Sequence, residues 1–201
     1  MNTTKFTSIK FTSNLILVTG PSRSGKSEWA ETLAMQTGKS VIYVATATSN
    51  PDDPEWLARI EKHQQRRPSS WTTLLVPLDL AATITNYSDI NHCLLVDSLG
   101  TWVANCLQQD DTIWQQTLQS LWNSLSKVKG SVIFVAEEAG WGVVPAYPMG
   151  RAFRDRLGNV VRYLGHLANP VYLVTGGHVL NLSTLGQPLP YNGAFGELPQ
   201  T

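Results

Sequence analysis

Short apolar runs alternate along this chain with longer segments that mix apolar and polar residues. The runs that predict buried strands are Leu15–Thr19, Val41–Thr46, Leu74–Val76, Cys93–Asp97, Ser131–Ala136 and Val171–Thr175. Helical patterns predict helices near Gly25–Gln36, Glu55–Gln65, Leu78–Thr85, Leu99–Gln108, Thr112–Val128 and Gly150–Leu167. The strand runs are apolar at successive positions, which is typical of parallel strands covered by helices on both faces. The alternation therefore predicts a three-layer α/β fold.

The length and the ends of the chain bound its organisation. A chain of 201 residues is most simply one domain, for which we expect residues 14–182, preceded by an N-terminal extension over 1–13. Residues 183–201 contain Pro188, Pro190 and Pro199 and predict an irregular C-terminal tail.

No apolar run is long enough to span a membrane, and Met1–Ser13 lacks the apolar core of a signal peptide. We therefore expect a cytoplasmic protein.

The net charge of the chain argues against one class of partner, and the placement of its basic residues has two possible explanations. Fifteen Lys and Arg residues balance fifteen Asp and Glu residues, so a general polyanion binder such as a nucleic-acid-binding protein is not expected. Eight of the fifteen basic residues gather in two clusters, which are Arg59, Lys62, Arg66 and Arg67, and Arg151, Arg154, Arg156 and Arg162. These clusters are either solvated helix faces or two walls around a compact anion such as a polyphosphate, and charge alone does not decide between them.

The strongest motif is a phosphate-binding loop. The segment Gly20, Pro21, Ser22, Arg23, Ser24, Gly25, Lys26 and Ser27 fits G-x-x-x-x-G-K-[S/T]. Its glycines let backbone N–H groups curl around phosphate oxygens, and the following helix adds its positive end. Lys26 is expected to reach the β- and γ-phosphates, and the Ser27 hydroxyl to ligate Mg²⁺. A simple glycine turn is the alternative, but a strand before the motif and a helix after it favour the phosphate loop.

Asp97 is the acid expected to complete a metal site. It closes the run Cys93–Asp97, at the carboxyl end of a predicted buried strand, where ligands of open α/β sheets bind. Together with Lys26, this position favours a Mg²⁺-binding role. The alternative is that Asp97 caps the helix that follows from Leu99.

Several further segments carry a resemblance to one enzyme family. With the phosphate loop they are Ala45-Thr46, Glu55–His63 followed by Arg67-Pro68 and Trp71, Pro77–Leu80, Asp97–Trp102 with Asn105, and Glu138–Pro145 with Arg151–Asp155. Over residues 15–182 the chain resembles the bifunctional adenosylcobinamide kinase / adenosylcobinamide-phosphate guanylyltransferases of cobalamin biosynthesis. The segments R-I-x-x-H-x-x-x-R-P and E-x-G-x-G-x-V-P…R-x-F-R-D are the most specific part of the match.

The resemblance implies a RecA-like phosphate-loop fold, a homotrimer and two reactions. ATP or GTP, with Mg²⁺, would phosphorylate the aminopropanol hydroxyl of adenosylcobinamide. GMP from GTP would then be transferred to that phosphate through a guanylylated His63, giving adenosylcobinamide-GDP. The motif positions also imply nucleotide contacts at Ala45, Thr46, Ala47 and Arg67, and a substrate-binding region around Glu138, Arg151 and Arg154. Glu137, which precedes Glu138, is expected to be an exposed acid in a loop.

His63 is also a sound nucleophile on chemical grounds. An imidazole that is near neutral at pH 7 can attack an α-phosphorus, and the resulting phosphoramidate is labile enough to pass the group on. Nearby cations such as Arg59 and Arg67 could neutralise the phosphate oxygens and the leaving pyrophosphate. Without the resemblance, a histidine on a solvated helix face would be the simpler interpretation.

The chain departs from the family pattern at a few positions. Leu75 stands where an acid is usual, Gly100 where a threonine is usual, and Val161-Arg162 where Asn-Gln is usual. If the usual acid contacts the guanosine nucleotide, Leu75 would weaken a strict preference for GTP over ATP. The phosphate loop and His63 are kept, so both half-reactions stay possible. Two rival functions are a phosphate-loop kinase of a small alcohol without nucleotidyl transfer, and a nucleotide-binding regulatory module.

Overall fold

A seven-stranded sheet forms the centre of the computed structural model, which describes residues 14–48, 58, 61 and 64–189. Its strands are β1 (Leu15–Gly20), β2 (Ser40–Ala45), β3 (Thr72–Leu75), β4 (His92–Asp97), β5 (Ser131–Glu137), β6 (Val171–Thr175) and β7 (His178–Asn181). They lie in the order β3-β2-β4-β5-β1-β6-β7, and only β6 and β7 pair antiparallel. This confirms the predicted RecA-like α/β fold with a mostly parallel sheet, in which β5 separates the phosphate-loop strand β1 from β4.

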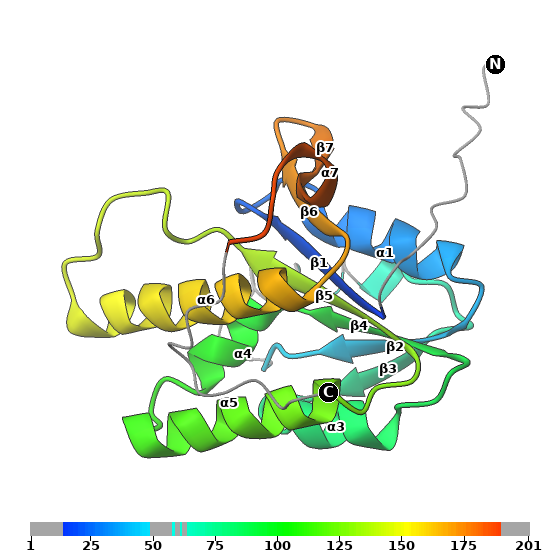
Figure 1. The fold of residues 1–201 in the computed structure, drawn as a ribbon, viewed down its shortest axis with the longest axis horizontal. Coiled ribbons are helices and arrows are strands. Elements are labelled where there is room, and N and C mark those ends of the chain that lie inside the picture. The colour runs from blue at the N-terminus through cyan, green and yellow to red at the C-terminus, as the bar shows by residue number, and fades with distance from the viewer. Residues whose placement is uncertain (1–13, 49–57, 59–60, 62–63, 190–201) are drawn as a thin grey trace.

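Helices cover both faces of the sheet (Figure 1). They are α1 (Lys26–Gln36), α3 (Leu80–Asn86), α4 (Leu99–Asn105), α5 (Asp111–Leu125), α6 (Pro148–Leu167) and the short α7 (Leu182–Leu185). Alternate residues of β1 divide the core, because Ile16 and Val18 pack with α1 on one face while Leu17 packs with α3 to α6 on the other. The central strands are buried on both faces, as their unbroken apolar runs predict.

The hairpin of β6 and β7 was missing from the predicted strands, which ended at Thr175. Gly176 and Gly177 join the two strands and have φ of 57° and 75°. Two successive positive φ values are typical of the tight turn that matches the twist of a hairpin, and Gly-Gly is one of its sequence signals. The short helix α7 follows β7 directly, so regular structure continues to Leu185.

Side-chain caps mark the starts of α4, α5 and the short α7, where Asn181 is the cap of the last. The Asp110 carboxylate accepts a hydrogen bond from the Ile113 N–H at the start of α5, and Ser98 accepts one from Thr101 at the start of α4. Most of the helix predicted near Glu55–Gln65 lies outside the described residues, although positions 58, 61, 64 and 65 are helical. Within the described part of the chain, no helix is both long enough and apolar enough to cross a membrane.

Candidate active site

The phosphate loop is held close against the neighbouring strand β6. A Cβ atom on Gly20 would lie 2.3 Å from the Val174 carbonyl oxygen, so only glycine fits there. Farther along the loop, Arg23 and Gly25 have φ of 59° and 92°. Such left-handed residues turn successive N–H groups toward one side of a loop. The loop ends at α1, whose cap residue Gly25 has no side chain to cover the N–H groups at the start of the helix, and the positive end of a helix suits an anion.

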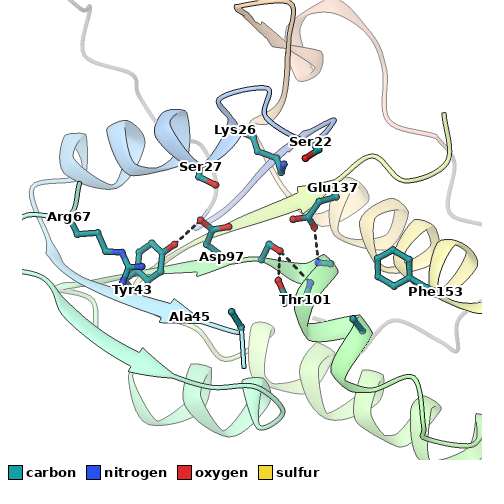
Figure 2. A pocket seen from close by; sticks show the side chains of 14 residues that line it. Ser22, Lys26, Ser27, Tyr43, Ala45, Arg67, Asp97, Thr101, Glu137 and Phe153 are labelled. Atoms are coloured by element: carbon teal, nitrogen blue, oxygen red, sulfur yellow. Dashed lines mark hydrogen bonds between the residues drawn. The ribbon is translucent and has the colours of Figure 1, made fainter. Parts of the chain in front are cut away.

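A cleft of about 320 Å³ opens beside this loop, at the carboxyl edge of the sheet (Figure 2). It is lined by Ser22, Lys26, Ser27, Tyr43, Ala45, Ala47, Arg67, Asp97, Ser98, Gly100, Thr101, Ala104, Glu137 and Phe153. The site residues that the sequence predicted and that line the cleft are Ser22, Lys26, Ser27, Ala45, Ala47, Arg67 and Asp97. The fold therefore brings the loop lysine, the loop serine and the strand-end acid together.

Lys26 is buried, with only 5% of its surface exposed. Its Nζ donates a 3.3 Å hydrogen bond to the Pro21 carbonyl oxygen. A buried ammonium group is costly unless it is paired, and a single carbonyl partner leaves it able to donate to phosphate oxygens. The Lys26 ammonium group therefore places a positive charge at the wall of the cleft.

Asp97 does not cap α4, because its neighbour Ser98 does so. Instead, the Asp97 Oδ2 accepts a 2.7 Å hydrogen bond from the Tyr43 hydroxyl. Burial raises the pKa of Tyr43 far above its ordinary value, and the negative charge of Asp97 raises that pKa further. The phenol therefore stays neutral and remains a hydrogen-bond donor to the carboxylate.

The residues of the cleft fit Mg²⁺. Ser27 and Asp97 offer one hydroxyl and one carboxylate on the same cleft, and Mg²⁺ is commonly bound by such sparse protein ligands together with phosphate oxygens and water. The described residues contain no cluster of three or more His, Cys, Asp or Glu side chains that could hold a metal by themselves. Phosphate oxygens and water are the other ligands that Mg²⁺ commonly takes in such a site.

Arg66 and Arg67 attach their segment to the body of the protein in different ways. The Arg67 guanidinium lies 3.6 Å from the centre of the Tyr43 ring and donates a 3.2 Å hydrogen bond to Thr73. Arg66 forms ion pairs of 2.9 and 3.1 Å with Glu28 and Glu31 of α1. Burial raises the pKa of Glu31, although the Arg66 charge acts to lower it. Only Arg67 of the two reaches the cleft.

Thr46 lies between two cleft residues but is itself fully buried. Its hydroxyl donates a 2.7 Å hydrogen bond to the Ser98 carbonyl oxygen and accepts one of 2.9 Å from the Ser98 N–H. The Asn105 amide also donates to the Thr46 carbonyl oxygen. Thr46 thus ties the end of β2 to the end of β4, while its neighbours Ala45 and Ala47 face the cleft.

None of the three residues expected near the corrinoid substrate lines the cleft. The Glu138 carboxylate accepts a 2.5 Å hydrogen bond from the Thr19 hydroxyl. Arg151 donates to the carbonyl oxygens of Pro145 and Ala146 and so braces the loop before α6, while Arg154 pairs with its neighbour Asp155. His63 lies outside the described residues.

The acid that does line the cleft is Glu137, which was expected to be an exposed loop acid. That expectation was wrong, because Glu137 is the last residue of β5, is only half-exposed, and accepts a 2.9 Å hydrogen bond from the Gly100 N–H. The other cleft residues that were not predicted as site residues are Tyr43, Ser98, Gly100, Thr101, Ala104 and Phe153. The position of Glu137 at a strand's carboxyl end was the available signal, since ligands gather at that edge.

Comparison with known proteins decides the family. The model of the family described as cobinamide kinase / cobinamide phosphate guanyltransferase matches residues 16–182. The chain belongs to this family. Among its relatives are the bifunctional adenosylcobalamin biosynthesis proteins CobP of Pseudomonas aeruginosa strain PAO1, at 38% identity, and CobU of Escherichia coli strain K12, at 36%. The first match covers 86% of this chain and 98% of the relative, and the second covers 81% and 96%.

Similarity to solved structures is more distant and concerns the fold. A protein studied as Project ID PH0250 from Pyrococcus horikoshii OT3 has a TM-score of 0.52 at 5% identity, covering 87% of this chain and 88% of that one. The RadB recombinase has a TM-score of 0.43 at 19% identity, covering 81% and 75%. Membership of the cobinamide kinase family therefore rests on the sequence relatives and on the motifs.

Proposed function

We propose that this protein phosphorylates the alcohol hydroxyl of adenosylcobinamide and then transfers GMP from GTP onto the new phosphate. The observation that carries the proposal is the convergence of Lys26, Ser27 and Asp97 on one cleft beside the phosphate loop. The family match over residues 16–182 supports the choice of cobinamide as acceptor. We further infer that residues 14–182 form the catalytic domain, with extensions at both ends.

In the kinase half-reaction, the loop and the start of α1 hold the β- and γ-phosphates of ATP or GTP. The buried Lys26 ammonium balances charge that develops between these phosphates as the γ-phosphoryl group leaves. Ser27 and Asp97 would hold Mg²⁺, which neutralises phosphate oxygens when it is bound. Tyr43 keeps the Asp97 carboxylate oriented toward that position.

In the guanylyl half-reaction, His63 is the proposed nucleophile. Its imidazole attacks the α-phosphorus of GTP, pyrophosphate leaves, and the phosphate of adenosylcobinamide phosphate then displaces the histidine to give adenosylcobinamide-GDP. The motif R-I-x-x-H-x-x-x-R-P supports this role, as does the position of its Arg67 at the cleft. Arg67 supplies positive charge for the triphosphate.

The cleft is too small for the whole substrate. A volume of about 320 Å³ suits part of a nucleotide and an alcohol side chain, so the corrinoid ring would remain outside.

We infer that the protein is a homotrimer in the cytoplasm. Exposed apolar side chains on the loop before α6, including Trp141, Val143 and Tyr147, offer surface that a subunit interface would cover.

The proposal is tested by incubating the protein with adenosylcobinamide, GTP and Mg²⁺ and measuring product masses. Wild-type protein should give the GDP product and should take label from α-³²P-GTP but not from γ-³²P-GTP. His63→Asn should stop at adenosylcobinamide phosphate, whereas Lys26→Ala should lose the kinase step. Phosphorylation without any α-label would favour the kinase-only alternative, and slow triphosphate hydrolysis alone would favour a regulatory module.

A further inference from the structure

The residues that line the cleft include two chemically different sets. One set is Lys26, Ser27, Asp97 and Arg67, whose charges and hydroxyl suit a metal-bound polyphosphate. The other set is small or apolar, namely Gly100, Thr101 and Ala104 of α4 together with Phe153 of α6. Glu137 lines the same cleft, and Figure 2 shows it between Lys26 and the start of α4. A carboxylate beside the start of α4 disfavours a phosphate there and can accept from a hydroxyl, so this part of the cleft suits the acceptor alcohol.

Glu137 is held firmly in this position. It ends β5, where its Cα pairs in register with that of Gly20, the first residue of the phosphate loop. Its Oε2 accepts a 2.9 Å hydrogen bond from the Gly100 N–H. The carboxylate is therefore carried by the strand next to the phosphate loop, and one of its oxygens is anchored to backbone.

Gly100 is the residue that makes room for this carboxylate. A Cβ atom at position 100 would lie 2.0 Å from the Glu137 Oε2 and 2.8 Å from its Cδ, so any larger residue would push the acid away. The position of the Glu137 carboxylate therefore depends on glycine at position 100, which leaves the space and donates the N–H.

We propose that Glu137 is a catalytic residue of the kinase half-reaction and accepts the proton of the acceptor hydroxyl. The alcohol oxygen forms a bond to the γ-phosphorus while the bond from that phosphorus to the β–γ bridging oxygen breaks. The nucleoside diphosphate leaves with the electron pair, and the hydroxyl proton passes to the Glu137 carboxylate and then to water. Side chains that take this proton and orient the hydroxyl are general features of phosphoryl transfer.

This role rests on the proposed function, and it predicts that the two half-reactions differ in whether they require Glu137. The kinase acceptor is a neutral hydroxyl that has to lose a proton. The guanylyl acceptor is a phosphate monoester, which is already anionic near neutral pH. Glu137 is therefore needed for the first reaction and not for the second.

The test is Glu137→Gln in the full-length protein, because the amide oxygen can still accept from Gly100 while the base is lost. Kinase kcat should fall about 100-fold or more. The KM for the nucleotide and the Mg²⁺ concentration for half-maximal rate should stay within twofold. Guanylyl transfer to supplied adenosylcobinamide phosphate should also stay within twofold. Asp111→Asn removes an exposed carboxylate on α5 and is the matched control.

Gly100→Ala is a second variant that displaces the acid without removing it, and it should lower kinase kcat at least tenfold while sparing guanylyl transfer. Kinase turnover within threefold of wild type in Glu137→Gln would overturn the inference. So would an equal loss of both half-reactions, or a larger kinase loss in Glu138→Gln than in Glu137→Gln. Wild-type protein that leaves adenosylcobinamide unphosphorylated would instead refute the proposed function, and the inference with it.

Discussion

The Tyr43 hydroxyl donates a 2.7 Å hydrogen bond to Asp97 Oδ2, and the Arg67 guanidinium lies 3.6 Å from the centre of the same ring. Tyr43 therefore connects the acid proposed to hold Mg²⁺ with an arginine from the motif that contains His63. Because the ring is buried, its position is fixed by the core between β2 and α1. Tyr43 thus contacts one residue proposed for each half-reaction, which are Asp97 for the kinase step and Arg67 for guanylyl transfer.

Tyr43→Phe should weaken Mg²⁺ binding while keeping the Arg67 stack. Loss of one hydrogen bond to a carboxylate costs about 1–2 kcal/mol, so the Mg²⁺ concentration for half-maximal kinase rate should rise about 5- to 30-fold. The rate at saturating Mg²⁺ should change little. A Mg²⁺ titration of kinase activity measures this, with Tyr87→Phe at the end of α3 as the control. An unchanged Mg²⁺ dependence would show that the bond does not orient Asp97.

Thr46→Val should destabilise the fold. The substitution leaves the buried N–H and carbonyl groups of Ser98 without the threonine hydroxyl, at a cost of about 2–4 kcal/mol in the free energy of unfolding. Urea unfolding measures the loss, and Thr46→Ser should retain most of the stability. A raised KM for nucleotide with unchanged stability would point instead to a direct nucleotide contact.

Arg66→Ala should reduce stability in a pH-dependent way. Burial holds the pKa of Glu31 above its ordinary value of 4.5 even with Arg66 present, so the folded state holds this proton more tightly than the unfolded state does. The contribution of Glu31 to stability therefore falls as the pH rises from about 4.5 through its folded pKa. Without Arg66 the pKa should rise further, and the stability loss should reach about 2 kcal/mol at pH 7.5.

Urea unfolding of Arg66→Ala at pH 5 and pH 7.5 measures this difference. Adding Glu31→Gln should recover much of the loss at pH 7.5, because it removes the unpaired buried charge. Glu28→Gln is the control, since its 66% exposed carboxylate should contribute less than about 0.5 kcal/mol. An equal loss at both pH values would contradict the assignment to Glu31.

Leu75→Glu should sharpen the preference of guanylyl transfer for GTP. Leu75 is 73% exposed and pairs in register with Ala45, which lines the cleft. A carboxylate there could accept from both N1–H and the 2-amino group of guanine, which leucine cannot do. The ratio of kcat/KM for GTP to that for ITP, which lacks the amino group, should rise about tenfold. Ile90→Glu, at an exposed position just before the amino end of β4, should leave the ratio unchanged.

Local pattern was enough to predict the phosphate loop, most strands and the position of Asp97. A phosphate loop is recognisable because glycine, lysine and serine must stand at fixed spacing for the backbone to curl. A buried parallel strand is recognisable because both of its faces are apolar. The motif that contains His63 was likewise found by its spacing, and the role of His63 stays a prediction.

Which of several neighbouring residues faces the cleft was decided only by the tertiary structure. Neighbouring side chains point to different sides where β2 and β5 end. Ala45 and Ala47 line the cleft while Thr46 between them is buried, and Glu137 lines it while Glu138 bonds to Thr19. The sequence places both glutamates at the same strand end. The pairing of β5 with β1 and β4, and the space left at Gly100, determine which carboxylate enters the site, because these contacts join residues far apart along the chain.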